Sequence, residues 1–240
     1  NWKAGTSFSN DASATSIGSI DSSGSVSTDA GFSIISYTGT GSAGTIAHGL
    51  GLEPKMVITR NRDTATNWCV YSSPVGNTKS LFLNLDNAPD TATQYWNDTT
   101  PTSSVFSVGS NTGTNKSGDD FISYCFAEIK GYSKIGTYTG NGSTSGNFIY
   151  TGFKPSFVMT KRTSGTAAWQ IIDTARNPIN PTTHALFPND QTNELGTYTT
   201  DYLSNGFNIQ VTTASRNGNG DTYLFMAFAE SPFVNSNGIP

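Results

Sequence analysis

One pattern of aromatic, proline and valine residues occurs twice in this chain, in a constant register. Each member of the first set has an identical partner 101 positions later: Tyr37–Gly39 and Tyr138–Gly140, Pro54 and Pro155, Val57 and Val158, Trp68 and Trp169, and Phe106 and Phe207. Phe126–Glu128 returns as Phe228–Glu230 with one residue of slip. A register held over that length predicts two tandem copies of one domain. Residues kept in both copies are expected to belong to the shared fold, whereas unshared residues are free to carry function.

Each copy is expected to consist of short strands. Apolar residues cluster or alternate in segments such as 55–60, 104–108 and 121–128, and turns rich in Gly and Pro separate these segments. No segment repeats apolar residues at the helical period of about 3.6 over several turns. Short strands between turns are typical of a β-sandwich. We therefore predict an all-β protein with two tandem, homologous β-sandwich domains, at 31–130 and at 131–240, the second ending in a short C-terminal tail.

Residues 1–30 have no counterpart before the second copy. They are rich in Ser, Gly and Asp, with sparse apolar positions such as Ile17, Ile20 and Val26. This lead-in segment is expected to form either a linker or one or two edge strands. The first residues lack both Met and a signal-peptide pattern, which predicts that the segment comes from the interior of a longer chain.

The composition argues against two classes of partner. Charged residues make up 12% of the chain, against about 25% in average proteins. The net charge is −4 and no basic run exists, so binding to nucleic acid lacks its electrostatic contribution. No apolar stretch approaches the roughly 18 residues of a membrane span, so no membrane insertion is expected. Uncharged, hydroxyl-rich β-proteins of this kind are typical of extracellular or virion proteins.

The sequence singles out no catalytic group, cofactor or metal site. His48 and His184 are not at equivalent positions, and neither has a partner at metal-ligand spacing. No nucleophile elbow opens a helix, and no pair of carboxylates stands out as a glycosidase pair. We therefore predict a protein without enzymatic activity, and we interpret His48 as a turn histidine that holds a backbone carbonyl. A polysaccharide-degrading activity is the enzymatic alternative.

Several residues are predicted to be structural. Cys69 and Cys125 occur only in the first copy and are expected to be two buried free thiols in a chain folded in a reducing cytosol, with a disulfide as the alternative. The shared Trp68 and Trp169 are expected in the core. Charged residues also recur at equivalent positions, and we expect them to form one carboxylate–cation pair in each domain: Arg60 with Glu128, and Lys161 with Glu230.

Function is expected in the residues that the copies do not share. Tyr95 and Trp96 fall in a long polar segment, 87–103, where the second copy has Gly196 and Thr197. We interpret them as candidates for sugar stacking or partner contact, with an anchor folded back onto the sandwich as the alternative. The second copy has its own unshared residues, some of them in the long segment 189–205: Tyr198, Tyr202, Arg176 and His184.

A set of motifs along the chain carries a family resemblance. The motifs are Asn1–Gly5, Ala30–Ile34, His48–Gly51, Tyr124–Glu128, Gly131–Lys134, Tyr138–Gly142 and Tyr150–Pro155. Together they resemble uncharacterised repeat domains in large structural proteins of marine tailed bacteriophages, including cyanophages, where such repeats follow jelly-roll modules in tail-fibre or appendage proteins. The resemblance implies a virion protein assembled in the host cytoplasm with other virion proteins as partners. It carries over no binding or catalytic residue.

These observations define two expectations for function. The first is a bacteriophage virion structural protein, part of a tail fibre or appendage that contacts the host surface through a glycan-type receptor. The alternative is a capsid-decorating, head-fibre or neck protein with no ligand of its own. Fibres of this kind are commonly homotrimers, so a homo-oligomer is expected, although the chain contains no heptad repeat.

Overall fold

The computed structural model describes residues 5–191 and 193–231. Within them the protein is all-β and β-sandwich-like, as predicted: antiparallel sheets carry nearly all regular structure, and the helices are single turns. The origin of the two halves by duplication stays a prediction. Most of the predicted C-terminal tail, 232–240, and the start of the lead-in segment, 1–4, lie outside the described residues.

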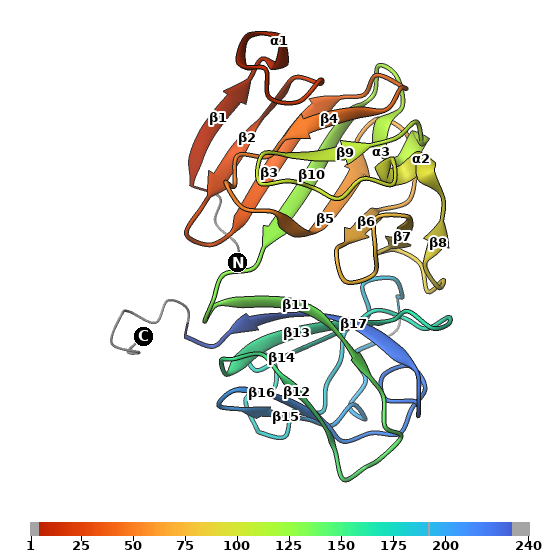
Figure 1. Cartoon of the computed structure of the whole chain (residues 1–240). Coiled ribbons are helices and arrows are strands. Elements are labelled where there is room, and N and C mark those ends of the chain that lie inside the picture. The colour runs from red at the N-terminus through yellow and green to blue at the C-terminus, as the bar shows by residue number, and fades with distance from the viewer. Residues whose placement is uncertain (1–4, 192, 232–240) are drawn as a thin grey trace. The chain divides into compact units, whose positions relative to one another are not determined.

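The chain divides into two compact units (Figure 1). Unit 1 comprises the residues up to Leu83 together with Pro89–Glu128. Unit 2 comprises Asn84–Ala88 and the residues from Ile129 onward. The division after Glu128 lies close to the predicted boundary at 130. The assignment of Asn84–Ala88 to the second unit was not foreseen.

Unit 1 is built on an eight-stranded sheet in the order β1-β2-β3-β10-β5-β6-β7-β8. Its strands are β1 (Thr6–Asn10), β2 (Ser22–Ser27), β3 (Phe32–Thr38), β5 (Pro54–Asn61), β6 (Cys69–Ser72), β7 (Lys79–Phe82), β8 (Asp90–Thr91) and β10 (Asp120–Ala127). Figure 1 shows β10 between β3 and β5, where it buries Phe121, Cys125 and Phe126. Pro54 opens β5 beside a register shift, a position where a missing N–H is tolerated.

A smaller sheet of β4 (Gly44–Ala47) and β9 (Val105–Val108) forms the second layer of unit 1. Tyr37 on β3 joins the layers, because its ring stacks on Phe121 at 5.2 Å and meets the edge of Phe106 at 6.2 Å. Three single-turn helices lie in the connections: α1 (Ala12–Thr15), α2 (Thr93–Trp96) and α3 (Thr112–Asn115).

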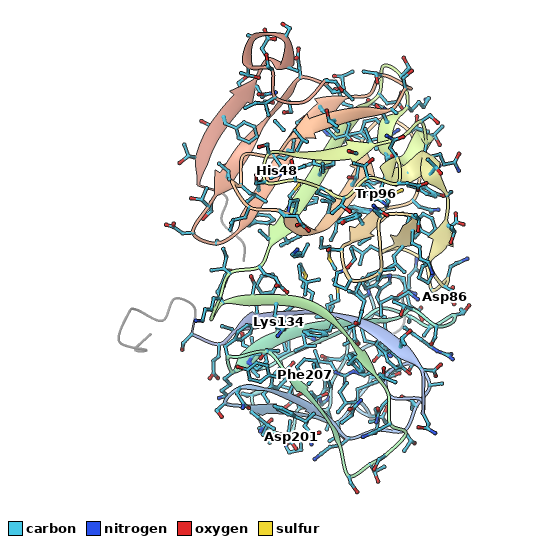
Figure 2. The ribbon with its side chains drawn as sticks, in the orientation of Figure 1. His48, Asp86, Trp96, Lys134, Asp201 and Phe207 are labelled. Atoms are coloured by element: carbon cyan, nitrogen blue, oxygen red, sulfur yellow. The ribbon has the colours of Figure 1, made fainter. Side chains whose placement is uncertain are left out.

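Unit 2 packs a four-stranded sheet, β11-β17-β13-β14, against a three-stranded sheet, β12-β16-β15. The strands are β11 (Ser133–Thr139), β12 (Asn147–Tyr150), β13 (Pro155–Arg162), β14 (Gln170–Asp173), β15 (Thr200–Leu203), β16 (Gly206–Ile209) and β17 (Thr222–Ala229). Tyr138 again links the layers: its ring stacks on Tyr223 at 4.8 Å and contacts the buried Phe207 at 6.5 Å (Figure 2).

Each unit contains a hydrogen-bonded turn of the same kind, which was not predicted from the sequence. In unit 1 the buried Asn115 accepts from the Thr40 N–H through its side chain and from the Gly41 N–H through its carbonyl. In unit 2 the buried Asn217 accepts from Asn141 and Gly142 in the same way. Each asparagine satisfies backbone donors that would otherwise be buried without partners, which stabilises the turn after the first shared strand.

The lead-in segment is part of the sandwich rather than a linker. Its strands β1 and β2 form a hairpin, and β2 pairs with β3 at the edge of the large sheet. The edge-strand alternative is therefore confirmed for the described residues of this segment.

The two long segments that hold unshared residues, 87–103 and 189–205, both contain regular structure. Segment 87–103 includes β8 and α2, and segment 189–205 includes β15. Residues 185–187 form only isolated bridges, from Leu186 to Ile171 and from Ala185 to Leu195.

Cys69 and Cys125 are free and buried, as predicted. Burial raises the pKa of both thiols to about 12. Because only the thiolate attacks, we expect neither cysteine to react rapidly with a thiol reagent in the native protein at pH 8, and both to react after denaturation. A Ser110→Cys variant, with its new thiol on the surface, serves as the reactive control. Rapid native labelling of the unmodified chain would contradict this expectation.

Candidate functional site

Tyr95 and Trp96 lie in the core of unit 1, so the prediction of a surface stacking pair is wrong. They form the end of α2, and Trp96 is 2% exposed (Figure 2). Tyr95 meets the edge of Phe82 at 5.6 Å, and Trp96 meets the edge of Tyr71 at 5.9 Å. The alternative, an anchor folded back onto the sandwich, describes both side chains. A single sequence does not distinguish an aromatic residue that is buried in a core from one that faces solvent.

Tyr198 and Tyr202 also have structural surroundings. Tyr202 is buried and its hydroxyl donates to the Ile172 carbonyl at 2.7 Å, while Tyr198 is half-buried against Phe187. Both are near Arg216, a fully buried guanidinium that sequence reasoning missed. Arg216 Nη1 donates to the Thr200 hydroxyl at 2.6 Å and to the Tyr198 carbonyl at 3.3 Å. Its role is therefore to hold the segment leading into β15.

The shared tryptophans differ between the units. Trp169 is 1% exposed and belongs to the interior of unit 2, as predicted. Trp68 is only half-buried: its ring stacks on Tyr124 at 6.5 Å, and the Arg60 guanidinium lies 5.7 Å from its centroid. The prediction of a core position is therefore wrong for Trp68.

The charged residues shared by the two copies have a different role from the predicted one. Lys161 is fully buried and donates to the carbonyls of Asp86, Arg162 and Ala167 at 3.0, 3.2 and 2.8 Å. Glu230 instead pairs with Lys154 at 2.7 Å, so the predicted Lys161–Glu230 pair is wrong. In unit 1, Arg60 donates to the Thr66 carbonyl rather than serving as the predicted partner of Glu128. Each cation thus holds the carbonyl six residues further along, at Thr66 and Ala167.

The ion pairs near the shared turns involve other residues. In unit 1, Asp119 pairs with Lys116 at 3.1 Å and accepts from the side chains of Asn61 and Thr64. In unit 2, Asp221 pairs with Arg162 at 2.6 Å. The hydrogen bonds to these carboxylates lower the pKa of both aspartates. These pairs were not predicted because their cationic partners, Lys116 and Arg162, stand at unrelated positions in the two copies.

His48 has the predicted role. It is fully buried, and its Nε2 lies 3.1 Å from the Thr102 carbonyl (Figure 2). The Leu50 N–H donates to Nδ1 at 3.2 Å, so the neutral ring carries its hydrogen on Nε2 and donates it to Thr102. Burial lowers the pKa of His48 to about 4. The imidazole is therefore neutral near pH 7.

Arg176 and His184 both line a pocket of about 440 Å³ in unit 2. The pocket is lined by Arg176, Asn177, Ile179, Pro181, Thr183, His184 and Glu194. The segments that follow β14 form it, and the equivalent part of unit 1 contains the strands β7 and β8 instead. This pocket combines planar polar side chains with an apolar wall of Ile179, which is 74% exposed.

Electrostatic contacts hold the polar side of this pocket in place. Arg176 donates to Asp173 at 2.6 Å through Nε and to Glu194 through Nη1, so the guanidinium bridges two carboxylates. His184 Nδ1 lies 2.6 Å from the Asn177 amide nitrogen, which is a donor, so Nδ1 accepts. With Nδ1 as the acceptor, the ring hydrogen is on Nε2, where it can be donated to a ligand. Such a site can bind a neutral, hydroxyl-rich molecule through hydrogen bonds.

Two further hollows lie in unit 1. One, of about 290 Å³, runs along the lead-in segment past Asp11 and Asp21, and the other, of about 480 Å³, lies beside Tyr95 and Asn111. Among residues 5–191 and 193–231, no cluster of His, Cys, Asp or Glu is arranged to hold a metal ion. No helix within the same residues is long and apolar enough to cross a membrane.

A comparison with known protein families matches residues 1–232 of the chain to a family model. The chain belongs to DUF7483, a family described as a domain of unknown function. The DUF7483 region extends over both units, so it corresponds to the pair of sandwiches and not to one repeat. No curated protein and no solved structure matches the chain.

The DUF7483 chain also exposes an aromatic pair that sequence reasoning passed over. Phe148 and Tyr150 alternate with the buried Ile149 along β12 and are 49% and 58% exposed. The Lys134 Nζ lies 5.1 Å from the centroid of Tyr150, within the range of a cation–π contact. Alternation along 148–150 places Phe148 and Tyr150 on one face of the strand. The sequence did not show that this face is the exposed one.

Proposed function

We propose that the chain is a structural module of a bacteriophage virion, part of a tail fibre or appendage, whose unit 2 contacts a host-surface glycan. The proposal that unit 2 binds a glycan rests on the pocket around Arg176 and His184. Sugars are bound by planar polar side chains that make paired hydrogen bonds with hydroxyls, beside an apolar surface for the C–H face of the ring. His184, Asn177 and Glu194 supply the planar polar side chains, and Ile179 supplies the apolar surface.

Other properties support the same proposal. The family resemblance implies a virion location, and the all-β architecture with 12% charged residues fits a particle component outside the cell. Arg176 holds both Asp173 and Glu194, so these carboxylates are engaged as binding and structural groups, and no catalytic step is part of the proposal. A homotrimer is the assembly we propose, by analogy with fibres of this type.

A specific observation favours the second candidate, a virion structural protein with no ligand of its own. Three of the unshared aromatic residues that the sequence singled out, Tyr95, Trp96 and Tyr202, are buried. A protein that stacks sugars on aromatic rings would expose such residues. On this alternative the pocket around Arg176 is only a crevice between loops.

A glycan array separates the two candidates. We expect the full chain to bind at least one glycan class and the His184→Ala variant to lose affinity by about tenfold or more, because one oriented hydrogen bond with its desolvated partners is lost. Trp96→Phe, a conservative change in the core of unit 1, is the control and should leave binding unchanged. Absence of binding by the full chain, or equal binding by His184→Ala, would favour the purely structural role.

A further inference from the structure

The smaller sheet of unit 2 turns one face toward the core and the other toward solvent. Ile149, Phe207 and Ile209 belong to the core cluster, and the residues that alternate with them point outward. Figure 2 shows Phe207 between the two sheets and Asp201 on the far side of the smaller one. The outward residues, which we call the outer face, are Phe148, Tyr150, Asp201, Leu203, Asn208 and Gln210.

The outer face carries an aromatic ring that lies over the neighbouring strand. A Cβ atom added at Gly206 on β16 would lie 2.8 Å from Cε2 of Phe148, so the ring occupies the space above this glycine. Phe148 is nevertheless 49% exposed. Tyr150, two positions along β12, extends the aromatic surface, and the Lys134 ammonium over its ring holds it in place.

Planar polar side chains stand in the same row as this ring. Phe148 lies opposite Asn208 on β16, and Asn208 lies opposite Asp201 on β15. The Gln210 amide donates to the Asp201 carboxylate at 2.7 Å, which fixes its orientation. An aromatic surface beside a few oriented amide and carboxylate groups is the arrangement that binds a sugar ring, with the C–H face on the aromatic ring and the hydroxyls on the polar groups.

The row continues past β15 into the pocket around His184. Thr182 and Thr200 form a bridge with two N–H···O bonds of 2.9 Å, and the Asn180 side chain accepts from the Tyr202 N–H. Thr182 is buried, so Pro181 and Thr183 point to the outer side, and Pro181 follows Asp201 in the row. Both residues line the pocket. Four neighbouring segments therefore join the pocket to Phe148 over roughly 14 Å, at about 4.8 Å per strand.

Unit 1 has neither part of this arrangement. Ile46 faces Phe106 as Ile149 faces Phe207, so Thr45 and Ala47 stand where unit 2 has Phe148 and Tyr150. The place of Asn208 is taken by Ser107, which is buried. The exposed aromatic pair and the pocket thus occur together, in the same unit.

We propose that the pocket and the outer face form one extended binding site for a neutral oligosaccharide. One sugar occupies the pocket at His184, the chain crosses Pro181 and Asn208, and a later sugar stacks on Phe148. This inference rests on the proposed glycan-binding function and adds the class of glycan. The distance exceeds a single sugar ring, so the ligand is a chain. The carboxylates of Asp201 and Glu194 along the site accept hydrogen bonds from hydroxyls and repel an acidic glycan.

Titration calorimetry of the full chain tests the proposal with oligosaccharides of one to six units, built from glucose, galactose, mannose or N-acetylglucosamine. For a bound class we expect affinity to rise by about tenfold or more between the single sugar and the longer chains, because only these reach Phe148. Phe148→Ala should remove this gain and leave single-sugar affinity unchanged, whereas Phe148→Tyr keeps the ring and should retain the gain. His184→Ala should weaken binding at every length.

Leu52→Ala, which removes an exposed apolar side chain from unit 1, is the control and should change nothing. Hydrogen exchange in β16 checks that Phe148→Ala leaves the sheet folded. Single-sugar binding with no gain for longer chains, or a gain that survives Phe148→Ala, overturns this inference and leaves the pocket alone as the glycan site. A gain that His184→Ala does not affect also overturns it, since pocket and ring would then not hold one chain. Absence of binding at every length overturns the proposed function itself.

Discussion

Replacing Lys161 by methionine is expected to destabilise unit 2 by about 3 kcal/mol or more. The Lys161 ammonium is fully buried and satisfies three carbonyl groups, one of them on Asp86 in the short segment that joins unit 2 from the first half of the chain (Figure 2). Methionine fills a similar volume but donates no hydrogen bond. The three carbonyls would then lose their donor in an environment that water does not reach.

The measurement is urea unfolding followed by hydrogen exchange in β13 and β17, which reports on unit 2 separately from unit 1. Lys154→Met is the matched control, because Lys154 lies on the surface in an exposed pair with Glu230 and should change stability by less than about 1 kcal/mol. A loss of stability from Lys161→Met no larger than that of the control would show that the buried hydrogen bonds contribute little.

Acidification is expected to destabilise unit 1 through His48 by about 3 kcal/mol between pH 6.5 and pH 4. Burial lowers the pKa of His48 to about 4, below the value near 6.5 of an exposed histidine. Between these values the unfolded chain binds a proton that the folded chain does not, so unfolding is favoured as the pH falls. The contribution is fully present above pH 6.5 and is lost as the pH approaches the folded pKa.

The physical cause is the hydrogen bonding of the ring. Nδ1 already accepts from the Leu50 N–H, so a proton on Nδ1 would face a donor inside the protein. His48→Gln keeps a neutral side chain with an N–H donor and should remove this part of the pH dependence. His184→Gln, at an exposed position, should leave it in place. The comparison is the free energy of unfolding in urea at several pH values, and equal profiles for the wild type and His48→Gln would contradict the assignment.

The residues confirmed from sequence are those whose roles depend on local pattern. The apolar cluster at 121–128 predicted a strand within one residue of β10, and the glycines around His48 indicated a turn histidine that holds a carbonyl. Predictions that required knowing a side chain's surroundings failed more often. Trp96 in a polar segment gave no sign of its burial, and Lys161 matched Arg60 in position without any sign of its three carbonyl partners.

The predictions of site residues were also right for some residues and wrong for others. Arg176 and His184 were selected because the second copy does not share them with the first, and both line the pocket in unit 2. Tyr198 and Tyr202 were selected on the same ground, yet they pack around Arg216. A residue that occurs in only one copy is free to differ between the copies. This criterion did not distinguish residues on the surface from residues that pack in the interior.

The amino-acid sequence by itself determined the all-β class and the positions of most strands, because alternation and turn residues act over a few neighbouring positions. The tertiary structure decided which edges are covered. Residues 5–30 supply strands and a bridge beside β3 and β4, whereas in unit 2 the strand orders of the described residues end at β11 and at β12. That difference depends on contacts between distant segments, whose free energy comes from burial and backbone pairing and leaves no local pattern in either segment.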